Sequence, residues 1–245
     1  MNDVPKILVG TLWYEEEDRE KHLEAIQSQE GVEIDHFTIS NLPEVEAHRE
    51  LWSKFESRKK DFDMITKIDA DTVLITKSIL RDIYDIMLSD PKITSIQANI
   101  DDYWTGDLIA GLNSFRPIVK FNPPSSNLFC DRVDTGHIKQ LKGKNVPSHV
   151  IPAAYHCHNA GNKQGFHFGI VRVLKGHAEV IQKVQDMWRK HRDDRRTYAL
   201  LGMMMAPNFI DREGFNYGDK KFESCYEYVC ENYEELKSKL VSEML

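Results

Sequence analysis

Residues 62–71 read Phe-Asp-Met-Ile-Thr-Lys-Ile-Asp-Ala-Asp, and this stretch decides the fold. Its first seven residues are mostly apolar or β-branched, a pattern that predicts a short buried strand. The strand pattern stops at Asp69 and Asp71. In open α/β sheets, ligands bind beyond the carboxyl ends of the strands. These two aspartates therefore mark the place where a site is expected.

The segments on both sides of this stretch alternate between strand and helix patterns. Strands are predicted at residues 6–12, 32–39 and 93–100, and helices at residues 18–29, 44–58 and 78–88. Such alternation predicts βαβ units and an α/β fold with a mainly parallel central sheet flanked by helices.

The second half of the chain has a different pattern. Residues 111–152 contain five prolines and are predicted to be irregular apart from one helix at residues 134–141. Further helices are predicted at residues 176–190, 196–205 and 226–245. We therefore expect one domain over residues 1–175 and, packed on it, a helical C-terminal extension over residues 176–245.

The composition excludes several classes of protein. The 245 residues are 41% hydrophobic and 29% charged, which excludes a disordered or collagen-like chain. The net charge of −7 disfavours nucleic acid and anionic membranes as partners. No apolar run is long enough to span a bilayer, and the first residues lack a secretory pattern. With only four unevenly spaced cysteines, the sequence indicates a soluble cytoplasmic protein without a disulfide framework.

Asp69 and Asp71 are predicted to face one cavity. Two carboxylates this close repel each other unless something neutralises them. Mg²⁺ or Mn²⁺ would remove that repulsion and keep positions for water or phosphate oxygens. In the alternative reading, one aspartate caps the next turn and the other is solvated.

With these elements in order, residues 5–170 resemble a GT-A glycosyltransferase, closest to the family 2 type. The first strand is followed by Thr11 and the acidic Glu15, and the Asp-x-Asp of the family matches Asp69 and Asp71. Later elements match a small-residue stretch at residues 110–116, an acidic motif at residues 131–134 and a late histidine, His156 or His158.

The resemblance implies a fold, an activity and a set of ligands. The fold is the GT-A nucleotide-diphospho-sugar transferase fold, and the activity is transfer of a sugar to a glycan or another hydroxyl-bearing acceptor, with inversion. The donor is a UDP- or GDP-linked sugar, and the cofactor is Mn²⁺ or Mg²⁺. The resemblance assigns the donor to Thr11, Leu12, Glu15, Ile39, Lys67, Asp69, Ala70, Asp71 and Lys163, and the metal to Asp69, Asp71, His156 and His158.

The sequence departs from the family at the catalytic base. The residue that aligns with the usual base is Arg132, so Asp131 and Asp134 are both candidates for deprotonating the acceptor hydroxyl. This departure keeps open a non-catalytic nucleotide-sugar- or glycan-binding module of the same fold. A sugar-1-phosphate nucleotidyltransferase is a further alternative, but residues 10–17 are acidic where such an enzyme needs a basic loop for triphosphate.

Two segments after residue 155 carry further candidates. In an extended segment, His156 and His158 point to one side and Cys157 points to the other, which predicts a core position for Cys157. Each histidine is either a metal ligand or is satisfied by main chain or water. Residues 159–169 are rich in Gly, Asn and Lys, which predicts either a flexible loop that closes Lys163 over the diphosphate or a plain surface turn.

Overall fold

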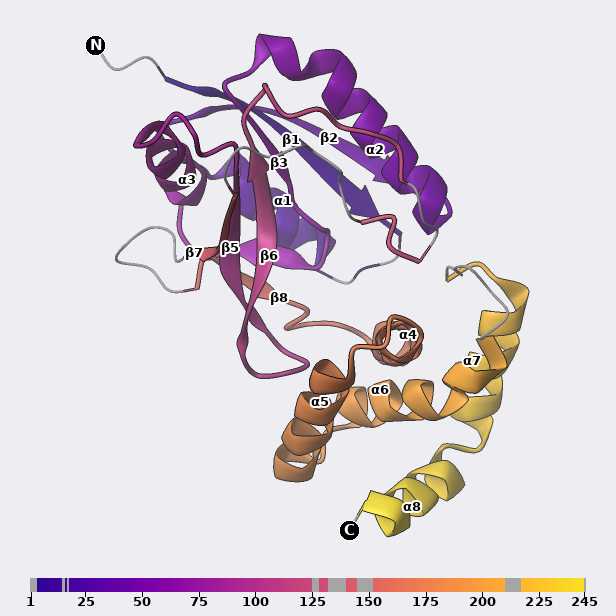
Figure 1. Ribbon diagram of the computed structural model, residues 1–245. Coiled ribbons are helices and arrows are strands. Elements are labelled where there is room, and N and C mark those ends of the chain that lie inside the picture. Colours follow the sequence, from indigo (N-terminus) through magenta and orange to yellow (C-terminus); the bar gives the residue numbers. More distant parts are fainter. Residues whose placement is uncertain are drawn as a thin grey trace. The chain divides into compact units, whose positions relative to one another are not determined.

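Figure 1 shows the computed structural model of the chain, which describes residues 4–14, 16, 18–124, 128–131, 140–144, 152–209 and 217–244. By their contacts the residues form two compact units. The first comprises Met1–Tyr103, Asp107–Ser125 and Cys130–Asn159, and the second comprises Trp104–Gly106, Ser126–Phe129 and Ala160–Leu245. The domain boundary expected at residue 175 stays a prediction.

The first unit contains a sheet of eight described strands. Their order is β2-β1-β3-β6-β5-β8-β4, and β7 pairs with β5. The bounds are β1 Lys6–Trp13, β2 Glu33–Ser40, β3 Met64–Lys67, β4 Thr72–Leu74, β5 Ser95–Asp102, β6 Leu108–Phe115, β7 Gln140–Lys144 and β8 Ala154–His156.

The sheet joins parallel and antiparallel pairs. Strand β1 is parallel to β2 and β3, and β5 is parallel to β7 and β8. Strand β6 runs antiparallel between β3 and β5, and β4 runs antiparallel to β8. The predicted α/β fold is confirmed, with four of the seven pairings among described strands parallel.

Strand β6 corrects the prediction of irregular structure from residue 111 onward. It continues to Phe115, and the first proline of the segment follows only at Pro117. Gly111 allows the close approach of β5, because a Cβ there would lie 2.1 Å from Cδ1 of Ile100. Gly111 is therefore a packing feature of a strand and not the start of an irregular segment.

Helices cover both faces of the sheet in the first unit: α1 Arg19–Gln27, α2 Glu44–Arg58 and α3 Ile79–Leu88, with the short 3₁₀ helix η1 Lys59–Asp61 (Figure 1). Strand β1 contributes Ile7 to a core with α3, and Leu8 to a second core with α2. Because successive strand residues point to opposite faces, a strand buried on both faces carries apolar residues at successive positions, as residues 7–9 of β1 and 64–65 of β3 do.

The second unit is helical, which confirms the expected helical C-terminal part. It contains α4 Asn162–Leu174, α5 Ala178–His191, α6 Asp194–Met205, the 3₁₀ helix η2 Ala206–Phe209, α7 Lys220–Glu231 and α8 Tyr233–Met244. The single helix predicted at residues 226–245 is wrong in detail, because the chain breaks it at Asn232 between α7 and α8. Among the described helices none is both long and apolar enough to cross a membrane.

The loop or turn predicted at residues 159–169 is wrong, since α4 occupies most of it. Its glycines allow close contact with α6: a Cβ on Gly169 would lie 1.9 Å from the main-chain oxygen of Ala199. A Cβ on Gly202 of α6 would in turn lie 2.1 Å from the main-chain oxygen of Phe166. The predicted helix at residues 134–141 lies mostly outside the described residues, and its last two positions belong to β7.

Candidate functional site

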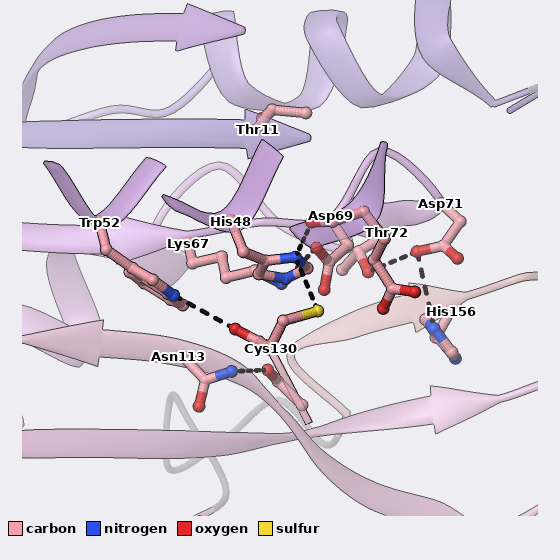
Figure 2. Close-up of polar contacts among 12 residues, drawn as sticks. Thr11, His48, Trp52, Lys67, Asp69, Asp71, Thr72, Asn113, Cys130 and His156 are labelled. Carbon is pink, nitrogen blue, oxygen red and sulfur yellow. Dashed lines mark hydrogen bonds and ion pairs between the residues drawn. The ribbon is translucent and has the colours of Figure 1, made fainter. Parts of the chain in front are cut away.

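The two aspartates predicted from the sequence lie in the turn that joins β3 to β4. Ile68 extends the pairing with β1 by donating from its main-chain nitrogen to Gly10, 3.1 Å away. The turn then closes with a hydrogen bond from the Thr72 nitrogen to the Asp69 oxygen, 2.9 Å long. Asp69 and Asp71 therefore stand at the carboxyl end of a central strand, as expected (Figure 2).

Asp69 forms an ion pair with a buried lysine. Nζ of Lys67, a side chain that is 5% exposed, donates to Oδ1 of Asp69. Burial alone would raise the pKa of Asp69, but the charge and hydrogen bond of Lys67 outweigh it and hold that pKa below its usual range. The carboxylate of Asp69 therefore stays charged, and Lys67 compensates for it.

Asp71 meets a different set of partners. Its Oδ1 lies 3.6 Å from Nε2 of His156, and its Oδ2 accepts from the Cys157 thiol at 3.1 Å. The Cys157 sulfur also lies 3.4 Å from Nε2 of His156. One potential ligand atom from each of these three residues lies within 4.8 Å of the others. A carboxylate, an imidazole and a thiol thus form a donor set that fits a divalent cation.

Strand pairing places His156 in this cluster. Strand β8 lies between β4 and β5, so His156 pairs with Thr72 on one side and Asp102 on the other. His156 Nδ1 donates to Oδ1 of the buried Asp102 at 2.7 Å, which directs Nε2 to Asp71. Metal-binding histidines commonly donate their second ring nitrogen to a carboxylate in this way.

Negative charge gathers around His156. Burial lowers the pKa of the ring, but Asp71 and Asp102 outweigh that effect and raise the pKa to about 9. At neutral pH the ring is then a cation beside Asp71. A bound metal ion would supply the same positive charge with the ring neutral.

Cys157 corrects the predicted orientation of the His-Cys-His segment. The residue has a φ of +59°, so the chain is not extended there, and the thiol points to Asp71 instead of away from the histidines. His158 has separate surroundings: its Nε2 lies 3.2 Å from Oδ2 of Asp101. Only His156 of the two histidines belongs to the described Asp71 cluster.

Glu16 is a site residue that the sequence analysis missed. Its carboxylate accepts from the Tyr14 nitrogen at 2.7 Å. Burial is the main cause that raises its pKa to about 7, and the charges of Asp71 and Asp69 add to the increase. Glu16 therefore lies in the electrostatic field of both aspartates. The run of three glutamates at residues 15–17 was the available signal, but Glu15 lies outside the described residues.

Asp131 lies near the Lys67–Asp69 pair. Its charge contributes to raising the pKa of Lys67 and acts on His48 as well. The side chain is exposed, while the preceding Cys130 is fully buried and its main-chain oxygen accepts from Trp52 Nε1 at 3.3 Å (Figure 2). The other candidate base, Asp134, lies outside the described residues.

Thr11 is buried at the end of β1, where a chain of hydrogen bonds passes through its hydroxyl. Its Oγ1 lies 2.9 Å from Nε2 of both His22 and His36, and Nδ1 of His22 donates to the Thr72 oxygen at 2.8 Å. Because His22 donates from Nδ1, Thr11 donates to His22 and accepts from His36. The hydroxyl thus links β1 to α1, β2 and β4.

The remaining predicted donor-binding residues lie in several places. Ile39 and Ala70 are buried, and Leu12 is half-buried at the end of β1. Lys163, at the start of α4 in the second unit, donates to Oε1 of Glu223 at 2.8 Å. The roles of these residues in donor binding stay predictions.

No protein-family model matches the chain, and no curated protein matches its sequence. Solved structures that are similar include a glycosyltransferase involved in the glycosylation of the major capsid of PBCV-1, with 19% identity and a TM-score of 0.33. That match covers 46% of this chain and 60% of the solved chain.

Two further matches cover almost the whole chain. Mannosyltransferase PcManGT from Pyrobaculum calidifontis, in complex with GDP-Man and Mn²⁺, is 9% identical with a TM-score of 0.41, over 98% of this chain and 86% of that one. Staphylococcus aureus TarS 1-349 is 10% identical with a TM-score of 0.37, and that match covers 97% of this chain and 91% of the solved chain. At these TM-scores, the argument for function rests on the residues of the site.

Proposed function

We propose that the protein is a metal-dependent glycosyltransferase that moves a sugar from a nucleoside-diphosphate donor to an acceptor hydroxyl, with inversion. The observation that carries the proposal is the arrangement of Asp71 and His156 beside the Lys67–Asp69 pair, at the carboxyl end of β3. This edge of an α/β sheet is where ligands bind.

The donors around Asp71 fit Mn²⁺ better than Mg²⁺. A carboxylate and an imidazole are available, with a thiol at hydrogen-bonding distance from both. Mg²⁺ prefers oxygen ligands alone. Mn²⁺ also binds carboxylates, but it is a softer ion and accepts an imidazole nitrogen more readily. When bound by Asp71 and His156, the ion would neutralise the charge that develops on the departing diphosphate.

The chain's own residues supply the other functions. Asp69, kept charged by Lys67, offers oxygen acceptors for donor hydroxyls. Asp131 is exposed to an incoming acceptor and acts as the general base. The acceptor oxygen attacks the anomeric carbon while the bond from that carbon to the diphosphate oxygen breaks, and the hydroxyl proton moves to Asp131. One such displacement inverts the anomeric configuration.

A transfer assay tests this function. Metal-depleted protein is incubated with UDP- and GDP-sugars and an array of glycan acceptors, with Mn²⁺ or with chelator, and products are identified by mass spectrometry. We expect Mn²⁺-dependent transfer that falls by about 100-fold or more in Asp131→Asn. Asp85→Asn, an exposed change on α3 beside Arg81, serves as the matched control and retains full activity.

Two other outcomes would redirect the proposal. If Asp134→Asn abolishes transfer and Asp131→Asn does not, Asp134 is the base. If the protein binds a nucleotide sugar with Mn²⁺ but transfers it to no acceptor, and the donor affinity is unchanged in the variant lacking both Asp131 and Asp134, the chain is a binding module and the catalytic proposal is wrong.

A further inference from the structure

A second group of potential metal ligands lies between the first turn of α2 and the segment at Cys130. Glu44 and His48 are four residues apart, so they lie on the same face of α2. Cys130 is fully buried and approaches that face from a segment 82 residues further along the chain. One potential ligand atom from each of the three residues lies within 4.8 Å of the others.

The spacing of the thiol and the imidazole suits a shared metal ion. The Cys130 sulfur lies 3.5 Å from Nδ1 of His48 (Figure 2). In a tetrahedral zinc site, a sulfur ligand at about 2.3 Å and a nitrogen ligand at about 2.0 Å lie about 3.5 Å apart. The two side chains therefore need little movement to bind one ion.

The imidazole of His48 has unused bonding capacity. The side chain is 5% exposed, and Nε2 is buried without a hydrogen-bond partner among the residues that the structure describes. Nδ1 donates to the main-chain oxygen of Glu44 at 2.8 Å. A buried polar atom without a partner destabilises the fold unless something satisfies it.

The electrostatic surroundings keep this ring in its metal-binding form. Burial is the largest cause that lowers the pKa of His48 to about 4, and the charge of Lys67 adds to the effect. The ring is therefore neutral at neutral pH, and Nδ1 can bind a metal when the single ring proton moves to Nε2, the nitrogen without a partner among the described residues.

We propose that Glu44, His48 and Cys130 bind a Zn²⁺ ion. A thiolate, an imidazole and a carboxylate are the ligand types that zinc takes in proteins, and three of them leave a fourth position for water. The site shares no residue with the Asp71 cluster.

The ion would join the segment containing Cys130 to α2, and Asp131 is the next residue. If the proposed function holds, the zinc site positions the general base.

Cobalt binding tests this site without any activity assay. Chelator-treated protein is titrated with Co²⁺, which gives a near-ultraviolet charge-transfer band when a thiolate binds it. We expect the band in the unchanged protein and in Cys157→Ser, whose thiol belongs to the Asp71 cluster, and in Cys225→Ser, whose thiol lies in α7. Cys130→Ser combined with Cys157→Ser should lose the band, because the thiolate of the Asp71 cluster is then absent as well.

A matched pair of glutamate variants on α2 covers the case in which Cys130→Ser does not fold. Zn²⁺ affinity is measured by competition with a chromophoric chelator, and Glu44→Gln should lower it by about tenfold or more. The control Glu46→Gln changes an exposed glutamate two residues further along α2 and should leave the affinity unchanged. The proposal is overturned if Cys157→Ser gives no thiolate band, if the band survives in the double variant Cys130→Ser/Cys157→Ser, or if the two glutamate variants bind Zn²⁺ equally.

Discussion

Nδ1 of His156 lies 2.7 Å from Oδ1 of Asp102, a pair of residues 54 positions apart that the pairing of β5 with β8 makes neighbours. Asp102 is buried and does not itself belong to the Asp71 cluster. Its position is that of a carboxylate that orients a metal-binding histidine.

Asp102→Asn should therefore weaken Mn²⁺ binding by about 10- to 100-fold, because the ring loses the partner that orients it. Calorimetric titration of Mn²⁺ measures the change. Asp101→Asn is the matched control, since Asp101 lies beside His158. If Asp101→Asn weakens binding and Asp102→Asn does not, the ligand is His158 and the assignment of His156 is wrong.

The Lys67–Asp69 pair predicts a coupled effect on stability. Lys67→Met keeps the bulk of the side chain but leaves Asp69 without its counter-charge. Because Asp69 is 47% exposed and solvent screens its charge, we expect a loss of only about 2 kcal/mol in the free energy of unfolding.

Urea denaturation measures this loss. The double variant with Asp69→Asn should recover about half of it, because no unpaired charge remains. Strictly additive effects of the two changes would contradict the pairing.

His36 predicts an acid-sensitive contribution to stability. Burial is the largest cause that lowers its pKa to about 4 in the folded protein, from the 6.5 of an unperturbed histidine. Between these values the unfolded chain binds one more proton, so the contribution is fully present above pH 6.5 and is lost as the pH falls to 4.

His36→Gln keeps a donor for Thr11 but cannot titrate. Its free energy of unfolding should therefore fall less steeply with acidification than that of the unchanged protein, by on the order of 1 kcal/mol per pH unit. Urea denaturation at several pH values between 6.5 and 4 makes the comparison. Parallel curves for the two proteins would rule out His36 as the source.

The close contact of α4 and α6 predicts that Gly169→Ala is severely destabilising. The new methyl group would lie 1.9 Å from the main-chain oxygen of Ala199, so the helices would have to move apart. We expect a loss of about 2 kcal/mol or more in the free energy of unfolding. Gly176→Asn is the control: at a φ of +67° and with no heavy atom within 4 Å, it should cost under about 1 kcal/mol. Equal losses would contradict the packing account.

Local patterns in the sequence predicted much of the sheet and part of the site. The apolar strands β1 and β3, the helix α2 and the position of Asp69 and Asp71 at a strand end all follow from residues close together in the chain. Each depends on the periodicity and end signals of one segment, which sequence reasoning can use directly.

The remaining site features depend on long-range pairing or on one unusual backbone angle. The Asp102–His156 pair requires the register of β5 against β8, which no local pattern specifies. The thiol of Cys157 reaches Asp71 because of a positive φ that a non-glycine residue seldom adopts. In α4 the glycines indicated a loop, because α6, the helix that packs against them, begins only at Asp194, 25 residues after Gly169.

The central claim is that Asp71 holds a divalent cation that binds the diphosphate of the donor. Calorimetric titration of the metal-depleted protein with UDP and with GDP, in Mn²⁺ and in EDTA, tests it most directly. We predict that one of these nucleotides binds only with Mn²⁺, that Asp71→Asn weakens this binding by at least about tenfold, and that Asp85→Asn does not change it. Equal nucleotide affinity in Mn²⁺ and in EDTA, or an unchanged affinity in Asp71→Asn, would contradict the account.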